Sequence, residues 1–203
     1  MNLSVSIVIP MYNAENFIGK VLESIVRQEY DAPVELIVVN DGSTDGSLEI
    51  VRGFAGRCDL RVIDQPNQGA VAATNNGILA SRYPVVCSVD SDVLLDQGWI
   101  ASIVREFEDP QVGAVQGYIR TPPSSPFLVR MAGYDLEYRY DRLTSKHVTQ
   151  VSTANTAYRR AALDKVGLFE PGFTYGYDND MSYRLQAGGY RLVMCQAASC
   201  EHY

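Results

Sequence analysis

Short apolar runs alternate with helical periodicity through the first half of the chain. Three runs are continuous enough for strands buried on both faces: residues 4–10, 34–40 and 85–89. Residues 60–64 are predicted to form a further strand. After the first run, apolar side chains recur at helical spacing up to about Arg27 and predict a helix, which Asn13 is expected to cap at its N-terminus. Further helices are predicted to begin near Ser47 and to span 69–81 and 99–108. Strand–helix alternation at this pitch predicts right-handed crossovers and a mainly parallel sheet that helices cover on both faces.

The pattern changes after residue 120. Residues 121–126, TPPSSP, form a loop by composition, and residues 127–143 read as a helix in which Arg and Tyr are mixed. That mixture fits either the amphipathic surface of a packed helix or a surface that binds sugar and phosphate. A strand and turn at 148–157, a helix at 160–166, a helix starting near Asp178 and Asp180, and a strand at 191–196 complete the prediction. We expect one α/β domain with a smaller second subregion.

Acidic side chains follow two of the predicted strands. Asp90-Ser91-Asp92 ends the run 85–89, and Asp41 ends the run 34–40. Ionised carboxylates are costly inside a sheet, whereas the carboxyl ends of parallel strands open onto the ligand crevice of such sheets. Aspartates at adjacent strand ends accept hydrogen bonds from a base or ribose, and Asp90 and Asp92 suit Mg²⁺ or Mn²⁺. Taken alone, D-x-D is also typical of a solvated acidic turn.

Composition narrows the classes of partner. The net charge of −7 argues against nucleic acid, and an acidic protein that binds a phosphorylated ligand needs a cation. Four scattered cysteines are typical of a reducing compartment, so a cytoplasmic location is expected. The spacing C-x4-C-x-H of Cys195, Cys200 and His202 fits no known pattern of zinc ligands. There is no G-x-G-x-x-G motif, P-loop, secretion signal or run of 18 apolar residues.

Six segments together resemble family 2 glycosyltransferases of the GT-A fold, over residues 4–202. They are IVIPMYNAENFI, VVNDGSTDGS, NQGAVAATNNGI, SVDSDVLLDQGW, STANTAYRRAALDKVGLFEPGF and GYDNDMSYR. The resemblance implies a single GT-A domain with a Rossmann-like sheet. Residues 1–120 would be the nucleotide-sugar-binding half, and residues 121–203 the half that binds the acceptor and carries the catalytic base.

The same resemblance assigns roles to individual residues. It implies that Asp41 holds the base and that Asp178 is the catalytic base. The implied metal ligands for Mn²⁺ or Mg²⁺ are Asp90, Asp92 and His202, although a histidine near a terminus is otherwise a surface residue. Donor binding is implied for Pro10, Tyr12, Asn13, Glu15, Asp41, Asn67, Gly69, Asn75, Asp90 and Ser91. The acceptor side is implied for Trp99, Asn155 and Tyr177.

The implied activity is an inverting, metal-dependent transfer from a nucleotide-diphosphate sugar to a hydroxyl of a glycan or lipid-linked acceptor. Two departures stand out: Tyr177 precedes Asp178 where the family often has Glu, and Thr74 stands where Arg is frequent. A sugar-phosphate nucleotidyltransferase and a non-catalytic nucleotide-sugar-binding module are the alternatives, and the Tyr177 departure favours the module. We also expect the sequence to be the catalytic part of a longer protein, associated with the cytoplasmic face of a membrane through a further C-terminal part.

Overall fold

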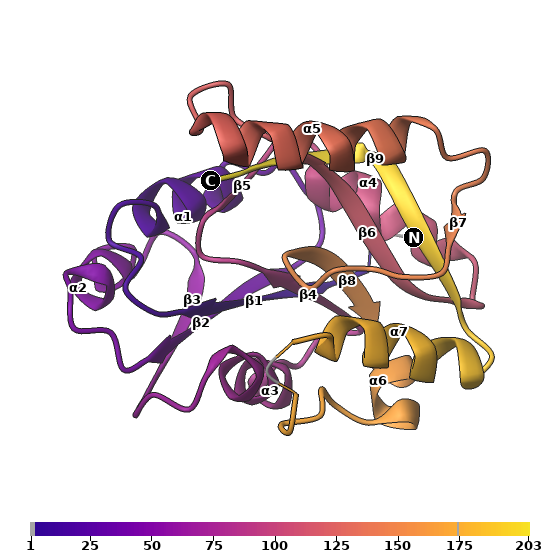
Figure 1. Cartoon of the computed structure of the whole chain (residues 1–203). Helices are drawn as coiled ribbons and strands as arrows, with labels where there is room; N and C mark the ends of the chain where they lie inside the picture. Colours follow the sequence, from indigo (N-terminus) through magenta and orange to yellow (C-terminus); the bar gives the residue numbers. More distant parts are fainter. Residues whose placement is uncertain (1–2, 174) are drawn as a thin grey trace.

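The computed structural model describes residues 3–173 and 175–203, which form one nine-stranded sheet in the order β3-β2-β1-β4-β8-β6-β9-β5, with β7 paired to β9 (Figure 1). The first four strands are parallel: β1 (Val5–Met11), β2 (Val34–Asp41), β3 (Asp59–Gln65) and β4 (Val85–Val89). Their carboxyl ends therefore meet at one edge of the sheet. The α/β fold class expected from the pattern is confirmed.

The second half of the sheet is mixed in direction. Strand β8 (Asn155–Arg159) runs antiparallel between β4 and β6 (Val112–Arg120), and β9 (Arg191–His202) runs parallel to β6. Two short strands, β5 (Val93–Leu95) and β7 (His147–Val148), pair antiparallel with β9. The strand and turn expected at 148–157 are thus two separate strands joined by a loop. The last strand is much longer than the expected 191–196, because β6 and β5 both pair with its last residues.

Helices cover both faces (Figure 1). One face carries α1 (Ile18–Val26), α2 (Ser47–Arg52), α4 (Trp99–Arg105), the 3-10 turn η1 (Glu106–Glu108) and α5 (Phe127–Asp141). The other carries α3 (Ala70–Ala80), α6 (Arg160–Val166) and α7 (Tyr177–Ala187). Ile7 and Ile9 of β1 pack into the first layer, while Val8 packs into the second. This alternation is the expected consequence of a strand buried on both faces.

Helix α3 lies close against β1. A Cβ built on Gly77 would collide with the Val8 side chain, so glycine permits this approach. The close packing positions the N-terminus of α3 beside the carboxyl ends of β1 and β2. No helix among the described residues is long and apolar enough to cross a membrane.

Asn13 does not cap the following helix, which begins only at Ile18 with Phe17 at its N-cap position. Asn13 instead adopts a φ of +50°, a left-handed conformation that Asn tolerates better than most residues. Its Oδ1 accepts a hydrogen bond from the Thr44 N–H at 2.8 Å, and its own N–H donates to Ser43 Oγ at 3.0 Å. The loop after β1 is therefore tied to the loop after β2.

Candidate functional site: an acidic cluster beside a polar hollow

The two aspartates after β4 are fixed by a tight turn. The Asp90 N–H donates to the Ala154 carbonyl, and the Val93 N–H donates back to the Asp90 carbonyl, both at 3.1 Å. The turn reverses the chain into β5, whose Val93 lies opposite His202 of β9 in the antiparallel register. His202 reaches the turn from the far end of the chain for this reason.

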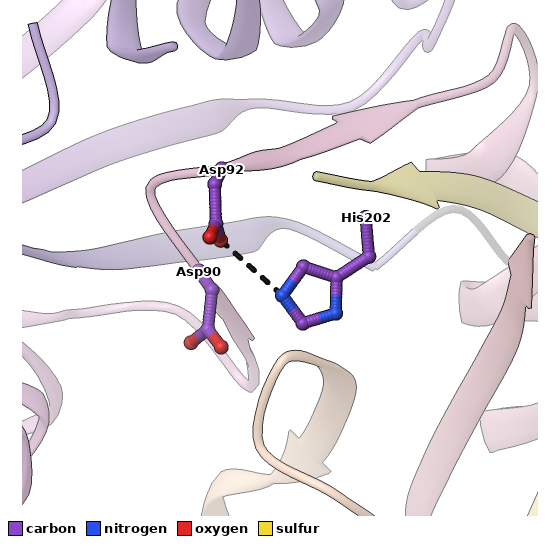
Figure 2. Close-up of side chains that lie close together, drawn as sticks. All are labelled: Asp90, Asp92 and His202. Atoms are coloured by element: carbon purple, nitrogen blue, oxygen red, sulfur yellow. Dashed lines mark ion pairs between the residues drawn. The ribbon is translucent and has the colours of Figure 1, made fainter. Parts of the chain in front are cut away.

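These three side chains form a compact cluster (Figure 2). One ligand atom from each of Asp90, Asp92 and His202 lies within 4.8 Å of the others. The Nε2 atom of His202 is 3.4 Å from Asp92 Oδ1, and both side chains remain more than a third exposed. The cluster thus brings together all three residues that the resemblance names as metal ligands.

The charges in the cluster are out of balance. Burial and then the negative charge of Asp92 raise the pKa of Asp90 to about 6, although His202 acts in the opposite direction. The hydrogen bond with Asp92 raises the pKa of His202 above its ordinary value. Two carboxylates share one site, and a cation bound between them would offset the cost of ionising Asp90 beside Asp92.

A polar hollow of about 340 Å³ opens beside the cluster, and we call it the first hollow. Nine of the residues named from the sequence line it: Pro10, Tyr12, Asp41, Asn67, Gly69, Asp90, Ser91, Asp92 and Tyr177. They come from the ends of β1, β2 and β4 and from the N-termini of α3 and α7. The strands that carry Asp41 and Asp90 are not adjacent as expected, because β1 lies between them. Their carboxyl ends nevertheless converge on one site.

Three residues named as donor ligands make hydrogen bonds within the fold, and their contact with a donor stays a prediction. Asn13 joins two loops as described, and Glu15 does the same, because its Oε2 accepts a hydrogen bond from the Gly46 N–H at 2.8 Å. Asn75 uses both ends of its amide on the backbone of Phe169: Nδ2 donates to the carbonyl at 2.7 Å and Oδ1 accepts from the N–H at 3.0 Å. None of the three lines the first hollow.

Trp99 and Asn155 do not line an acceptor surface, because both side chains are fully buried, with 0% exposure. The Trp99 Nε1–H donates to Asn155 Oδ1 at 2.6 Å, and Asn155 Nδ2 donates to Cys200 Sγ at 2.9 Å. The pair satisfies its own polar atoms between α4, β8 and β9. Its role in the structure is to fix the end of β9, which carries His202.

Asp178 lines a second hollow of about 540 Å³, whereas its neighbour Tyr177 lines the first. Both residues belong to the first turn of α7, where the helix dipole stabilises negative charge. Asp178 is half-buried, and its Oδ1 accepts a hydrogen bond from the Asn179 N–H at 2.9 Å. The two hollows therefore adjoin at the start of α7, and Asp178 is not in the same hollow as Asp41, Asp90 and Asp92.

Residues of the Arg/Tyr segment 127–143 line part of the second hollow. Leu136, Arg139 and Tyr140 of α5 line it, so part of the helix borders a cavity while Phe127, Leu128 and Tyr138 remain exposed. The Gln116 side chain, which also lines this hollow, donates to the Tyr140 hydroxyl at 2.6 Å. Part of this segment therefore borders a cavity, and binding of sugar or phosphate by it stays a prediction.

Two polar residues near the site were not singled out from the sequence. Gln65, at the end of β3, donates a hydrogen bond to Asp41; a glutamine at a strand end carries no motif that would have marked it. The Tyr158 hydroxyl is buried without a hydrogen-bond partner among the described residues. Burial, followed by the charge of Asp178, raises the pKa of Tyr158, so this phenol stays protonated.

Comparison with known proteins identifies first the fold class and then the family. The mannosyltransferase PcManGT from Pyrobaculum calidifontis, solved with GDP-Man and Mn²⁺, superposes with a TM-score of 0.82 at 23% identity, over 98% of this chain and 56% of that chain. Staphylococcus aureus TarS 1–349 in complex with UDP-GlcNAc gives a TM-score of 0.77 at 17% identity, over 98% and 58%. The fold is thus that of GT-A glycosyltransferases. The sequence model described as Glycosyl transferase family 2 matches residues 6–167, and the chain belongs to this family.

Curated relatives agree with this assignment. The dodecaprenyl-phosphate galacturonate synthase of Rhizobium johnstonii is 29% identical over 172 residues, covering 82% of this chain and 51% of its own length. The poly-β-1,6-N-acetyl-D-glucosamine synthase of Staphylococcus aureus is 26% identical over 205 residues, covering 97% and 49%. The chain therefore spans about half the length of these relatives and is a glycosyltransferase domain by its family.

Proposed function

We propose that this domain catalyses inverting, metal-dependent transfer of a sugar from a nucleotide-diphosphate sugar to a hydroxyl group of a glycan or lipid-linked acceptor. The observation that carries the proposal is the cluster of Asp90, Asp92 and His202 at the mouth of the hollow that Asp41 lines. The names of the relatives and the ligands of the solved neighbours support the substrate class without establishing it for this chain.

The donor set fits a divalent cation. Two carboxylates and one imidazole suit Mn²⁺, and two carboxylates suit Mg²⁺, with water and phosphate oxygens completing either coordination shell. The raised pKa of Asp90 supports this fit, because a nearby cation would offset both the burial and the Asp92 charge that disfavour its ionised form. When bound, the ion supplies positive charge beside the diphosphate that leaves.

The remaining roles fall to residues of this chain. Asp41 accepts a hydrogen bond from the base, and Tyr177 forms the wall between the donor and the acceptor. Asp178, across that wall, takes the proton from the acceptor hydroxyl as the hydroxyl attacks the sugar from the side opposite the diphosphate. Attack from that side inverts the configuration at the anomeric carbon. We place the domain in the cytoplasm, because few and scattered cysteines, here unpaired and three of them buried, are typical of reducing compartments.

Substitution Asp178→Asn tests the proposed base. Release of nucleoside diphosphate is measured with UDP-GlcNAc, UDP-Glc and GDP-Man as donors and with oligosaccharide and lipid-linked saccharide acceptors in Mn²⁺. We expect a loss of roughly 100-fold or more in turnover with nearly unchanged nucleotide affinity, since general-base catalysis contributes about 10²–10⁴-fold. The exposed Asp164→Asn of α6 serves as a control of equal charge change. Near-normal turnover of Asp178→Asn would remove Asp178 from this role.

The same assay separates the alternatives. A non-catalytic binding module would bind donors but release no nucleoside diphosphate, with or without acceptor. A nucleotidyltransferase would form pyrophosphate from a nucleoside triphosphate and a sugar phosphate. The loop after β1, PMYNAENFIGK, is not the glycine-rich basic loop typical of that class, and this favours the transferase.

A further inference from the structure

The side chain of Gln65 makes hydrogen bonds to Asp41, the proposed base-binding residue, and to Asn76. It ends β3 directly opposite Asp41 of β2 in the parallel register, and its side chain is 9% exposed. The Gln65 Nε2 group donates to Asp41 Oδ1 at 2.8 Å, and its Oε1 accepts from Asn76 Nδ2 of α3 at 2.7 Å. Because a carboxylate only accepts, the amide nitrogen must face Asp41, and Asn76 then holds the amide in this orientation.

Asp41 has little acceptor capacity left. Its Oδ1 accepts from Gln65 and from the Gln68 backbone N–H at 2.9 Å, and its Oδ2 accepts from the Gly69 N–H at 2.8 Å. An ionised carboxylate offers about four acceptor positions. Among the described residues, three are filled, and the one that remains is on Oδ2. The carboxylate is only 3% exposed but lines the first hollow, so a ligand there meets a single open position.

Nucleobases differ in what they present to such a group. Uracil and thymine offer one ring N–H on the pairing edge. Guanine offers two parallel N–H donors that match both oxygens of a carboxylate, and cytosine and adenine place a nitrogen lone pair beside one amino group. A carboxylate with one open position on one oxygen can accept the single ring N–H of uracil or thymine. It leaves one of the two guanine donors without a partner, and it repels the nitrogen lone pair of cytosine or adenine.

The overall fold does not decide this choice. One structural neighbour of this chain was solved with GDP-Man, at a TM-score of 0.82, and another with UDP-GlcNAc, at a TM-score of 0.77. Because the shared fold is found with both nucleotides, we look for the basis of a choice in the side chains around Asp41, and Gln65 is the side chain that donates to Asp41 Oδ1.

We propose that Gln65 is a specificity-determining residue: by occupying Asp41 Oδ1 it limits the carboxylate to one incoming N–H and selects uracil or thymine nucleotides over guanine nucleotides. This inference rests on the proposed function, in which Asp41 contacts the base of the donor. Asn76 has a positioning role, because it keeps the Gln65 amide turned toward Asp41.

The test compares the affinities of UDP, dTDP and GDP by calorimetry in MnCl₂ for the wild type, Gln65→Met and Gln97→Met. Methionine keeps the length of the side chain but removes its donor, and Gln97 is an exposed glutamine that does not line the hollow. We expect UDP or dTDP to bind the wild type and Gln97→Met roughly 10-fold tighter than GDP, about the worth of one unmade hydrogen bond. In Gln65→Met the freed Oδ1 accepts the second guanine donor, so the ratio falls at least 3-fold.

Asn76→Ala is the second variant, because it releases the Gln65 amide without touching Asp41, and it is expected to lower the same ratio. Equal or tighter binding of GDP to the wild type would overturn the inference, as would an unchanged ratio in both folded variants. If none of the three diphosphates binds the folded wild type, the proposed function itself fails. Binding with the wrong base preference overturns only the inference about Gln65.

Discussion

Replacing Asp92 by Asn separates metal binding from stability more cleanly than any other change in the cluster. The substitution keeps the shape of the side chain but removes one of two carboxylates from the donor set. In the metal-free protein it breaks the pair with His202, whose atoms are 3.4 Å apart and whose side chains are 38% and 35% exposed. A pair this exposed contributes at most about 1 kcal/mol after solvent screening. Relief of the repulsion on Asp90 acts in the opposite direction, so the free energy of unfolding should change by less than about 1 kcal/mol.

The effect on metal affinity is expected to be far larger. Substitutions in the outer shell of a metal site already cost 10–100-fold in affinity, so loss of a direct ligand should cost about 100-fold or more. Calorimetric titration with MnCl₂ measures this affinity, and urea unfolding without metal measures stability. The exposed Asp31→Asn is the control, because it removes the same charge away from both hollows. Wild-type Mn²⁺ affinity in folded Asp92→Asn would refute the assignment of Asp92 as a ligand.

Three further outcomes follow from the structure. Because the pKa of Asp90 is raised from 3.8 to about 6, its contribution to stability is present below pH 4 and is lost as pH rises to 6. The metal-free wild type should therefore lose stability relative to Asp90→Asn across this window, and a constant difference would contradict the argument. Asn75→Ala leaves the buried N–H and carbonyl of Phe169 without hydrogen-bond partners. It should therefore lower the free energy of unfolding, measured in urea, by roughly 3 kcal/mol. A loss under 1 kcal/mol would show that Asn75 does not stabilise the fold. Tyr158→Phe removes a buried hydroxyl that has no partner among the described residues, so thermal unfolding should show unchanged or slightly higher stability, and a marked loss would reveal a partner.

Periodicity predicted the elements well wherever the apolar pattern was long. Strands β1 to β4 and the helices between them lie within a few residues of their expected positions. The strands β1, β2 and β4 are buried, and both faces of the sheet demand apolar residues there, whereas the edge strand β3 is only partly buried. The aspartates that end β2 and β4 were likewise foreseeable, because charge is excluded from the strands but not from their ends.

Contacts between residues far apart in the sequence determine the features that local patterns did not predict, namely the full length of β9 and the positions of several site residues. Residues 196–198, Gln-Ala-Ala, have little strand propensity and bulge out of the pairing with β6, whose register jumps from Cys195 to Ser199. Strand β9 continues beyond them because β6 and β5 pair with its last residues. His202 enters the metal cluster by this pairing alone. The burial of Trp99 against Asn155 and the use of Asn75 on Phe169 join residues 56 and 94 positions apart, and no local pattern marks such contacts.

The most direct measurement is the anomalous scattering of manganese in crystals grown with MnCl₂ and UDP. If these residues bind the metal, one strong peak is expected within bonding distance of Asp90, Asp92 and His202, adjoining diphosphate density in the first hollow. A manganese peak elsewhere, or diphosphate bound without any metal at these three residues, would contradict it.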